Sequence, residues 1–311
     1  MSGPVSTADV PAARVESRVA SAFVEVSESR SATVGGVQVR RALPKRQRRT
    51  VGAWCFVDHL GPATLDERTQ VEIGPHPHIG LQTVTWLLQG EQLHLDSLGS
   101  EQLIRPGELN LMTAGHGVVH AEESRDYRGA IHGVQLWVAQ PDATRDASPA
   151  FEHHDELPLV ELDAAVATVL LGEFSGAVSP ARRDTPLVGL DLAARRGASV
   201  LPLSPDFEYA LIVLDGALTV GSTVVRPGAL AYLGEGRDEL PLAATEATRA
   251  LLLGGVPFGS PVFMWWNFVA RSREEIAVAY EEWQSGAARF ADVASPLPRI
   301  PAPAPSWPPG R

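Results

Sequence analysis

Short runs of alternating apolar and polar residues occupy most of this chain. The clearest are TVTWLLQG, QLHLDSLG, NLMTAGHGVVHAE and IHGVQLWVAQP, which all lie between residues 83 and 141. Each has the length and the β-branched or aromatic content of a strand, and turn-forming residues separate them. The 28 Gly and 25 Pro residues also favour turns over long helices. The pattern therefore predicts an all-β structure built from many short strands.

One amphipathic helix is expected late in the chain. Ser272 and Glu275 form a capping box at its start, and Gly286 is placed to end it. Its apolar face consists of Ile276, Ala279, Tyr280 and Trp283.

An internal repeat indicates two similar β domains. Residues 85–112 align with residues 211–233: each segment has an apolar strand ending in Gly, an alternating hairpin, the triplet Arg-Pro-Gly and another apolar strand. Two copies of one antiparallel unit predict two small β-barrels or sandwiches in tandem. The boundary between them is expected near Pro141 to Pro149.

These patterns divide the chain into four parts. Residues 1–30 are small and polar and are expected to form a flexible tail. The first β domain should span residues 31–145, and the second, with the helix, residues 146–290. Residues 291–311 contain seven prolines and predict an extended, unpacked end.

Composition narrows the classes of function. The net charge of −11 argues against a general nucleic-acid binder. The basic run Arg40–Arg49 could still contact nucleic acid, but a solvated surface is the favoured interpretation. No apolar run is long enough to cross a bilayer, so no membrane partner is expected. The single cysteine, Cys55, and a start without signal-peptide features favour the cytoplasm.

Two pairs of polar residues in strand-like segments carry the candidate chemistry. Positions i and i+2 share one face of a strand, so His76 projects with His78 and His120 with Glu122. The residues between the pairs form a strand–hairpin–strand unit, which can bring the second pair beside the first. Three imidazoles and a carboxylate suit one Fe(II), Mn(II), Ni(II), Cu(II) or Zn(II) ion. On an octahedral ion, four such ligands leave two positions open.

A structural role for these residues is the alternative. A single His-x-His pair is weak evidence, and Pro77 fits a loop as well as the end of a strand. The second pair, at this spacing, favours a metal site. Offsets counted from the repeat place Pro202, Ser204, Pro241 and Ala243 at the corresponding positions of the second domain. No histidine follows His154, so one metal site per chain is predicted.

Other polar and aromatic residues have expected roles outside the metal site, and three positions allow two interpretations. His94 and Asp96 share a strand face and could form a polar edge, which is favoured, or support a metal ligand. His116 fits a turn or a proton shuttle, and His132 a buried core position or a hydrogen-bond donor near the site.

His153 and His154 are expected in a solvated linker, and Asp58 and His59 in a turn. Cys55 is expected to be buried and inert. The segment Trp265–Phe268 should pack between helix and barrel.

These segments together resemble the pirin family, a group of bicupins. The resemblance rests on RRALPKRQRRTVGAWCFVDHLGP, HPHIGLQTVTWLLQGEQLHLDSLGS, IRPGELNLMTAGHGVVHAEE, IHGVQLWVAQP and PVFMWWNFVARSREEI, in this order from about residue 37 to 286. It implies two tandem cupin domains. The first would bind a metal, usually iron, through His76, His78, His120 and Glu122, and the second would have lost its ligands.

The resemblance also implies two classes of activity. Some members have quercetin 2,3-dioxygenase activity, and others act as redox-sensitive cofactors of transcription regulators or bind metabolic enzymes. Where the family commonly has Arg, Glu and Arg, this chain has Ile79, Gln82 and His116, which changes the charge expected near the site.

The leading hypothesis is an iron-dependent dioxygenase that acts on flavonol-like or other enolisable aromatic substrates with dioxygen. Glu122 would be a metal ligand or would also act as the base. The alternatives are a metal-loaded, redox-sensitive regulatory protein with a protein partner, and a non-redox cupin such as an isomerase.

Overall fold

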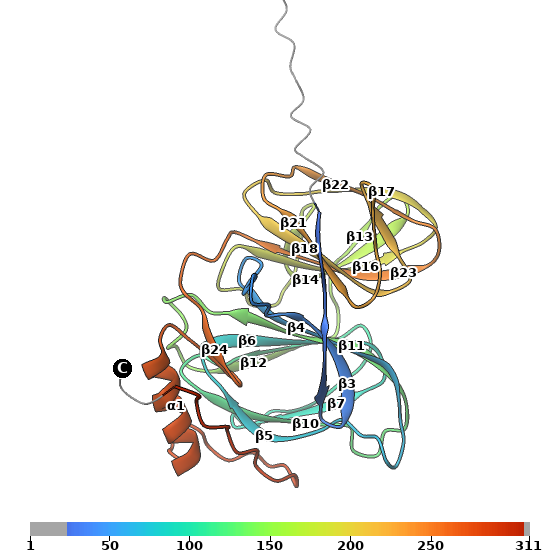
Figure 1. Cartoon of the computed structure of the whole chain (residues 1–311). Coiled ribbons are helices and arrows are strands. Elements are labelled where there is room, and N and C mark those ends of the chain that lie inside the picture. Colours follow the sequence, from blue (N-terminus) through green and yellow to red (C-terminus); the bar gives the residue numbers. More distant parts are fainter. Residues whose placement is uncertain (1–23, 308–311) are drawn as a thin grey trace, which may run out of the picture.

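A computed structural model describes residues 24–307 and shows two stacked β-sandwiches with one helix against the first (Figure 1). Each sandwich has one large and one small antiparallel sheet, and no strand pairing among the described residues joins the two sheets. Of the two forms that the sequence left open, the domains therefore have the sandwich or jelly-roll form and are not closed barrels.

The first sandwich contains a seven-stranded and a four-stranded sheet. In spatial order, the large sheet consists of β12 (Ala150–His154), β9 (Leu109–Thr113), β6 (Leu81–Gln89), β11 (Gly129–Ala139), β4 (Trp54–Leu65), β3 (Val37–Leu43) and β2 (Arg30–Val34). The small sheet consists of β5 (Glu72–His78), β10 (Val118–Glu123), β7 (Gln92–Asp96) and β8 (Glu101–Ile104).

The second sandwich repeats this arrangement. Its large sheet consists of β1 (Glu25–Glu28), β21 (Ala229–Gly234), β18 (Glu208–Asp215), β23 (Thr248–Gly255), β16 (Leu187–Ala194), β14 (Ala165–Phe174) and β13 (Leu159–Glu161), with β15 (Ala177–Val178) also paired to β14. Its small sheet consists of β17 (Gly197–Pro202), β22 (Glu239–Ala244), β19 (Leu218–Val220) and β20 (Thr223–Val225). The predicted repeat is confirmed, because β6 to β9 and β18 to β21 pair in the same way.

One outer strand of the second sandwich's large sheet comes from the start of the described part of the chain. Strand β1 pairs with β21 in the second sandwich, whereas β12, which follows the first sandwich, returns to pair with β9. The expected tail of residues 1–30 is therefore wrong for residues 25–30, which lie in β1 and at the start of β2, and residues 1–23 lie outside the described part. His153 and His154 belong to β12 and not to a solvated linker.

The two large sheets pack against each other through a shared apolar core. Two buried tryptophans of the first sandwich donate hydrogen bonds across this contact. Trp54 Nε1 donates to the carbonyls of Val188 and Gly254, at 3.2 Å each, and Trp86 Nε1 donates to Asp191 Oδ2 at 2.8 Å. Because a buried donor without a partner is costly, these bonds fix how the sandwiches sit together.

The end of the chain returns to the first sandwich. Strands β24 (Phe263–Trp265) and β25 (Phe268–Ala270) form a hairpin before helix α1 (Arg273–Ser285). Ser272 caps this helix, and Gly286 ends it with a left-handed φ of 69°, as predicted. Phe268 is fully buried against the helix, which confirms the packing role expected for the segment Trp265–Phe268.

The proline-rich end is extended, but the prediction that it is unpacked is wrong. Residues 295–302 lie against β5 and α1, and Ala302 is buried. Proline favours an extended backbone and has no N–H group to donate. A proline-rich segment therefore stays in place only if groups of other elements bond or pack against it. Tryptophan and backbone groups of the first sandwich and α1 supply them here.

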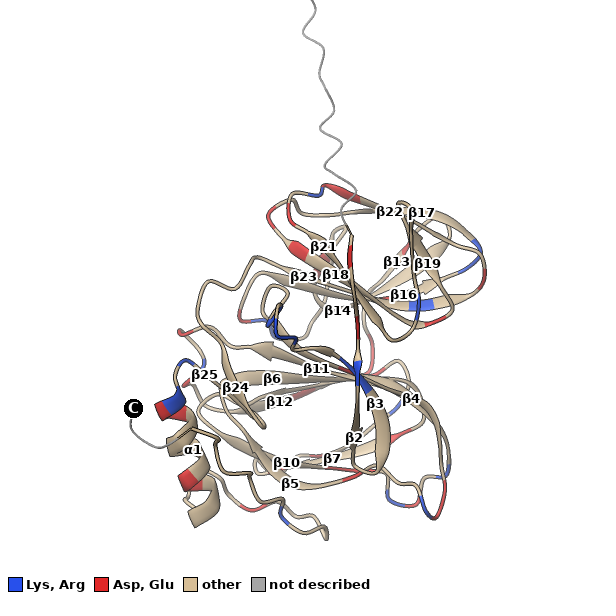
Figure 2. Ribbon diagram, viewed as in Figure 1, with Lys and Arg blue, Asp and Glu red and all other residues tan. Residues whose placement is uncertain are grey.

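The basic run Arg40–Arg49 makes contacts within the protein. Arg41 forms an ion pair with Asp58, and the Arg48 guanidinium lies 3.2 Å above the Tyr232 ring. Lys and Arg are interspersed with Asp and Glu over both sandwiches (Figure 2). Within residues 24–307, the one helix is too short and too polar to span a membrane.

Candidate metal centre

Two adjacent strands of the small sheet carry the predicted site residues. His76 and His78 lie on β5, His120 and Glu122 lie on β10, and His120 is directly opposite His76. A β-bulge shifts the register between His120 and Glu122, because Glu122 pairs with Ile73. The structure thus brings the two pairs together on one face, inside the first sandwich.

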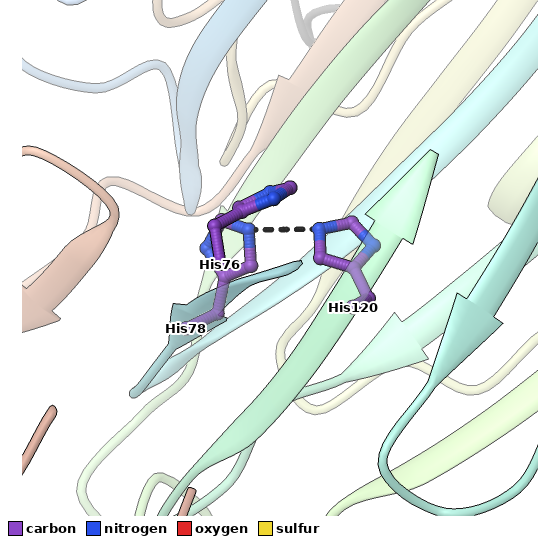
Figure 3. A group of neighbouring side chains, drawn as sticks. All are labelled: His76, His78 and His120. Atoms are coloured by element: carbon purple, nitrogen blue, oxygen red, sulfur yellow. Dashed lines mark hydrogen bonds between the residues drawn. The ribbon is translucent and has the colours of Figure 1, made fainter. Parts of the chain in front are cut away.

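The three imidazoles form a compact, buried group. One nitrogen of each lies within 4.8 Å of the others, and the rings face a common centre (Figure 3). The Nε2 atoms of His78 and His120 are 3.0 Å apart. The exposed fraction of the three residues is between 1% and 5%.

Hydrogen bonds on the outer side fix the orientation of two of these rings. His76 Nδ1 is 2.9 Å from the Gly74 carbonyl oxygen, and His78 Nδ1 is 3.0 Å from the Asn267 carbonyl oxygen. A carbonyl oxygen only accepts, so both Nδ1 atoms carry hydrogen and donate. Burial lowers the pKa of His76 to about 4 and the pKa of His78 well below its ordinary value. The rings are therefore neutral, and each directs an Nε2 lone pair inward.

The third ring has a histidine–aspartate pair behind it. His94 Nε2 donates to Asp96 Oδ2 at 3.0 Å, which leaves His94 Nδ1 as an acceptor 3.4 Å from His120 Nδ1. Phe151 of β12 stacks on His94 at 4.4 Å between ring centroids. Both interpretations of this pair therefore hold in part: Asp96 Oδ1 accepts from the turn of the β7–β8 hairpin, as the favoured interpretation predicts, and His94 contacts a site histidine.

Glu122 faces the same cavity and is buried, with 6% of its surface exposed. Among the described residues, its carboxylate has no hydrogen-bond or ion-pair partner, and burial raises its pKa to about 7. Its oxygens lie outside the compact group formed by the three histidines. A buried carboxylate without a partner is costly unless a proton or a cation balances it.

These observations fit a single metal ion. Neutral imidazole nitrogens and one carboxylate are ligands of first-row divalent metals. Two ligand nitrogens bound to one ion at about 2.1 Å, with a right angle between them, lie about 3.0 Å apart. The separation of the His78 and His120 Nε2 atoms has this value. His76, His78 and His120 are therefore able to hold a metal.

A cavity of about 430 Å³ opens onto the three histidines. Phe56 and Trp137, stacked at 4.0 Å, form part of its wall. Arg41 and Asp58 form a bidentate ion pair beside Phe56, with N–O distances of 2.6 and 2.7 Å and the Arg41 guanidinium 4.5 Å from the centre of the Phe56 ring. Binding sites of about 300–1,000 Å³ with apolar walls and a few polar groups are typical for small molecules.

Several other sequence candidates lie away from this cavity. His116 is exposed and its Nδ1 contacts the Ala147 carbonyl, as the turn interpretation predicts. His132 is buried and contacts His59 Nε2 to Nε2 at 2.8 Å, on the face of the large sheet opposite the cavity. His59 therefore lies within β4 and not in the expected turn. Ile79 packs under α1, and Gln82 bonds Thr113, so neither departure from the family pattern lines the cavity.

The second sandwich has leucines where the first has its polar site. The pairing of β19, β22 and β17 places Leu201, Leu203, Leu240 and Leu242 at positions equivalent to His76, His78, His120 and Glu122. The residues predicted from offsets (Pro202, Ser204, Pro241 and Ala243) are wrong by one position. The connection that leads into β22 is one residue shorter than the connection into β10, and the connection that follows β17 is one residue longer than the one that follows β5. Because side chains alternate along a strand, a shift of one residue moves each side chain to the other face of the sheet.

Sequence reasoning missed contributions from distant segments. Asn267 offers a backbone carbonyl to His78, and Trp266 and Ile300 line the cavity. A backbone carbonyl has no signature in a sequence. The M-W-W-N-F segment is part of the family resemblance, but its contact with the site depends on the return of the chain to the first sandwich.

The fold and the site define a bicupin whose first domain carries three histidines able to bind a metal. The family models described as Pirin and as Pirin C-terminal cupin domain match residues 36–138 and 189–291. The chain belongs to the pirin family.

Three relatives illustrate this similarity. A Pseudomonas aeruginosa protein with the name "Putative quercetin 2,3-dioxygenase PA1205" is 50% identical over 88% of this chain and 87% of its own length. A pirin-like protein of Caulobacter vibrioides is 34% identical over 86% of this chain and 95% of its own. The crystal structure of quercetin 2,3-dioxygenase from Acinetobacter baumannii covers 92% of this chain and 97% of that protein, with 44% identity and a TM-score of 0.89.

Proposed function

We propose that this protein is a metal-dependent dioxygenase of the quercetin 2,3-dioxygenase type, acting on flavonol-like or other enolisable aromatic compounds. The observation that carries the proposal is the group of three inward-facing histidines beside an unpaired, buried Glu122. The similarity to proteins named quercetin 2,3-dioxygenase supports the reaction class. A cytoplasmic location remains part of the proposal.

The metal would be held by His76, His78 and His120, with Glu122 as a fourth ligand. Fe(II) is the ion we propose, and Mn, Ni, Cu and Zn are the alternatives that the same ligands accept. When bound, the ion supplies Lewis-acid activation and orientation of the reacting oxygen atoms.

The residues of the chain would hold and deprotonate the substrate. The stacked Phe56 and Trp137 offer an apolar wall to a flat aromatic ring and keep water away from it. Glu122 would accept the proton of the substrate hydroxyl, either as a ligand or after leaving the ion. The hydrogen bonds of His76 and His78 to backbone carbonyls would keep their Nε2 atoms directed at the site.

Elemental analysis of protein purified without chelator or added metal tests the first part of the proposal. We expect about one first-row metal per chain, and its loss in His120→Ala but not in the control His116→Ala, which alters an exposed histidine. Full metal content in His120→Ala would show that the ligand set is wrong.

Oxygen uptake by the iron-loaded protein with quercetin and a panel of catechols and enols tests the second part. We expect uptake that Glu122→Gln reduces by about 10²-fold or more, as for loss of an acid–base group. Absence of uptake with every compound would refute the dioxygenase proposal. Turnover under argon would instead support an isomerase, and a partner captured only under oxidising or only under reducing conditions would support the regulatory role.

A further inference from the structure

Residues 295–302, the strap, cross the bulged end of β5 beside the histidine site. The Ile300 N–H donates to the Pro75 carbonyl at 2.9 Å, and the Ile300 carbonyl accepts from Trp283 Nε1 at 3.0 Å. Ile300 is thus held by its backbone on both sides, between β5 and α1.

Contacts at both ends keep the strap in place. Ser295 Oγ donates to Glu123 Oε1 at 2.5 Å, and the Ala302 N–H donates to Gln284 Oε1 at 3.2 Å. The Arg299 guanidinium lies 3.3 Å above the Trp283 ring. Both ends of the strap are hydrogen-bonded, and its prolines limit the backbone angle φ. The strap therefore loses little conformational entropy when it takes up this position.

Gly74 permits the close approach of the strap. A Cβ atom at this position would lie 2.1 Å from the Pro298 carbonyl oxygen, a distance that no side chain can occupy. The Gly74 carbonyl also accepts the hydrogen bond of His76 Nδ1. The same backbone segment therefore orients a site histidine and supports the strap.

The strap contributes one side chain to the cavity. Ile300 lines it together with Trp266 and residues of both sheets. The family model for the second cupin ends at residue 291, before the strap begins, so Ile300 lies beyond the matched domains, whereas Trp266 lies within the second.

We propose that Ile300 is a specificity-determining residue: its side chain limits the size of the aromatic group that can bind beside the three histidines. The aromatic class of the substrate rests on the proposed function. The role of Ile300 in limiting size does not depend on turnover, so equilibrium binding can test it separately.

Binding to the Co(II)-loaded protein under argon, followed by visible absorption, tests this role. The probes are azide, which is small, and catechol and 3-hydroxyflavone, which are aromatic and of increasing size. The variants are Ile300→Trp, Ile300→Ala and the control Leu297→Ala, which alters an apolar residue of the strap that does not line the cavity. Metal content is measured for each.

We expect Ile300→Trp to weaken 3-hydroxyflavone binding at least tenfold while azide binding changes less than twofold. Leu297→Ala should change neither. If the unaltered protein binds azide but neither aromatic probe, Ile300→Ala must bind at least one of them. Equal changes for azide and 3-hydroxyflavone, no change for either, or failure of Ile300→Ala to admit an excluded probe would overturn the proposal. None of these measurements uses oxygen, so failure of the dioxygenase reaction would be seen separately.

Discussion

Replacement of His94 by Phe tests whether the residues behind His120 tune metal affinity. The phenyl ring keeps the size of the imidazole and its stacking on Phe151, 4.4 Å away between centroids. It cannot accept the hydrogen bond from His120 Nδ1 or donate to Asp96. Asp96 Oδ1 still accepts from the N–H groups of Leu98 and Ser100, which preserves the turn.

The expected magnitude follows from the geometry. Removal of a group that hydrogen-bonds a metal-ligating histidine typically weakens metal affinity about 10- to 100-fold, a cost of about 1.4–2.8 kcal/mol. The distance of 3.4 Å between the Nδ1 atoms of His120 and His94 is longer than usual for a hydrogen bond, which places the cost at the lower end. A loss of about 1.4 kcal/mol corresponds to a tenfold weaker affinity. We therefore expect His94→Phe to weaken metal binding about tenfold.

Competition with a chelator of known affinity measures this change, with the same ion in both proteins. His116→Ala is the control, because it removes an exposed histidine outside the cavity. Thermal unfolding of the metal-free proteins separates loss of affinity from loss of stability. Affinity within twofold of the unaltered protein would refute the supporting role of His94, and loss of all binding would show that His94 is itself a ligand.

Three further predictions concern the scaffold. Trp86→Phe should lower the free energy of unfolding by about 1–2 kcal/mol in denaturant titrations, because Asp191 loses a buried donor; an unchanged midpoint would contradict this. Burial lowers the pKa of His59 to about 3. Below pH 6.5 the unfolded chain therefore binds a proton at this residue that the native protein does not bind. For this residue, the free energy of unfolding should fall by up to about 1.4 kcal/mol for each pH unit below 6.5. His59→Leu should reduce that slope, and equal slopes would refute the assignment. Burial raises the pKa of the Cys55 thiol to about 12, so a thiol reagent should label it only after unfolding, and rapid labelling at pH 7 would show that it is accessible.

The sequence predicted the parts of this protein that depend on local pattern. Alternation identified the strands of the repeat, and two pairs of residues with i, i+2 spacing brought His76, His78, His120 and Glu122 to one face. The capping box and Gly286 located the helix. Each of these signals lies within a few residues of the feature that it predicts.

Features that depend on long-range pairing were not predictable in this way. The strap looked unpacked because prolines have no donors, and its partners are Trp283 and Pro75 in other elements. The register of the second sandwich shifted by one residue because of small differences in loop length, which offsets cannot detect. The support that His94 gives to His120 depends on pairing between β7 and β10.

The pairing of β1 with β21 makes the second sandwich depend on a strand that precedes the first sandwich in sequence. A gene cut after β12 would leave β1 on the first fragment without its partner and expose the β21 edge of the second fragment's large sheet to self-association. The sandwich with leucines at the equivalent positions therefore holds β1 in place, and the two sandwiches cannot be separated without freeing that strand. The retention of a domain without ligands thus has an architectural explanation that is independent of catalysis.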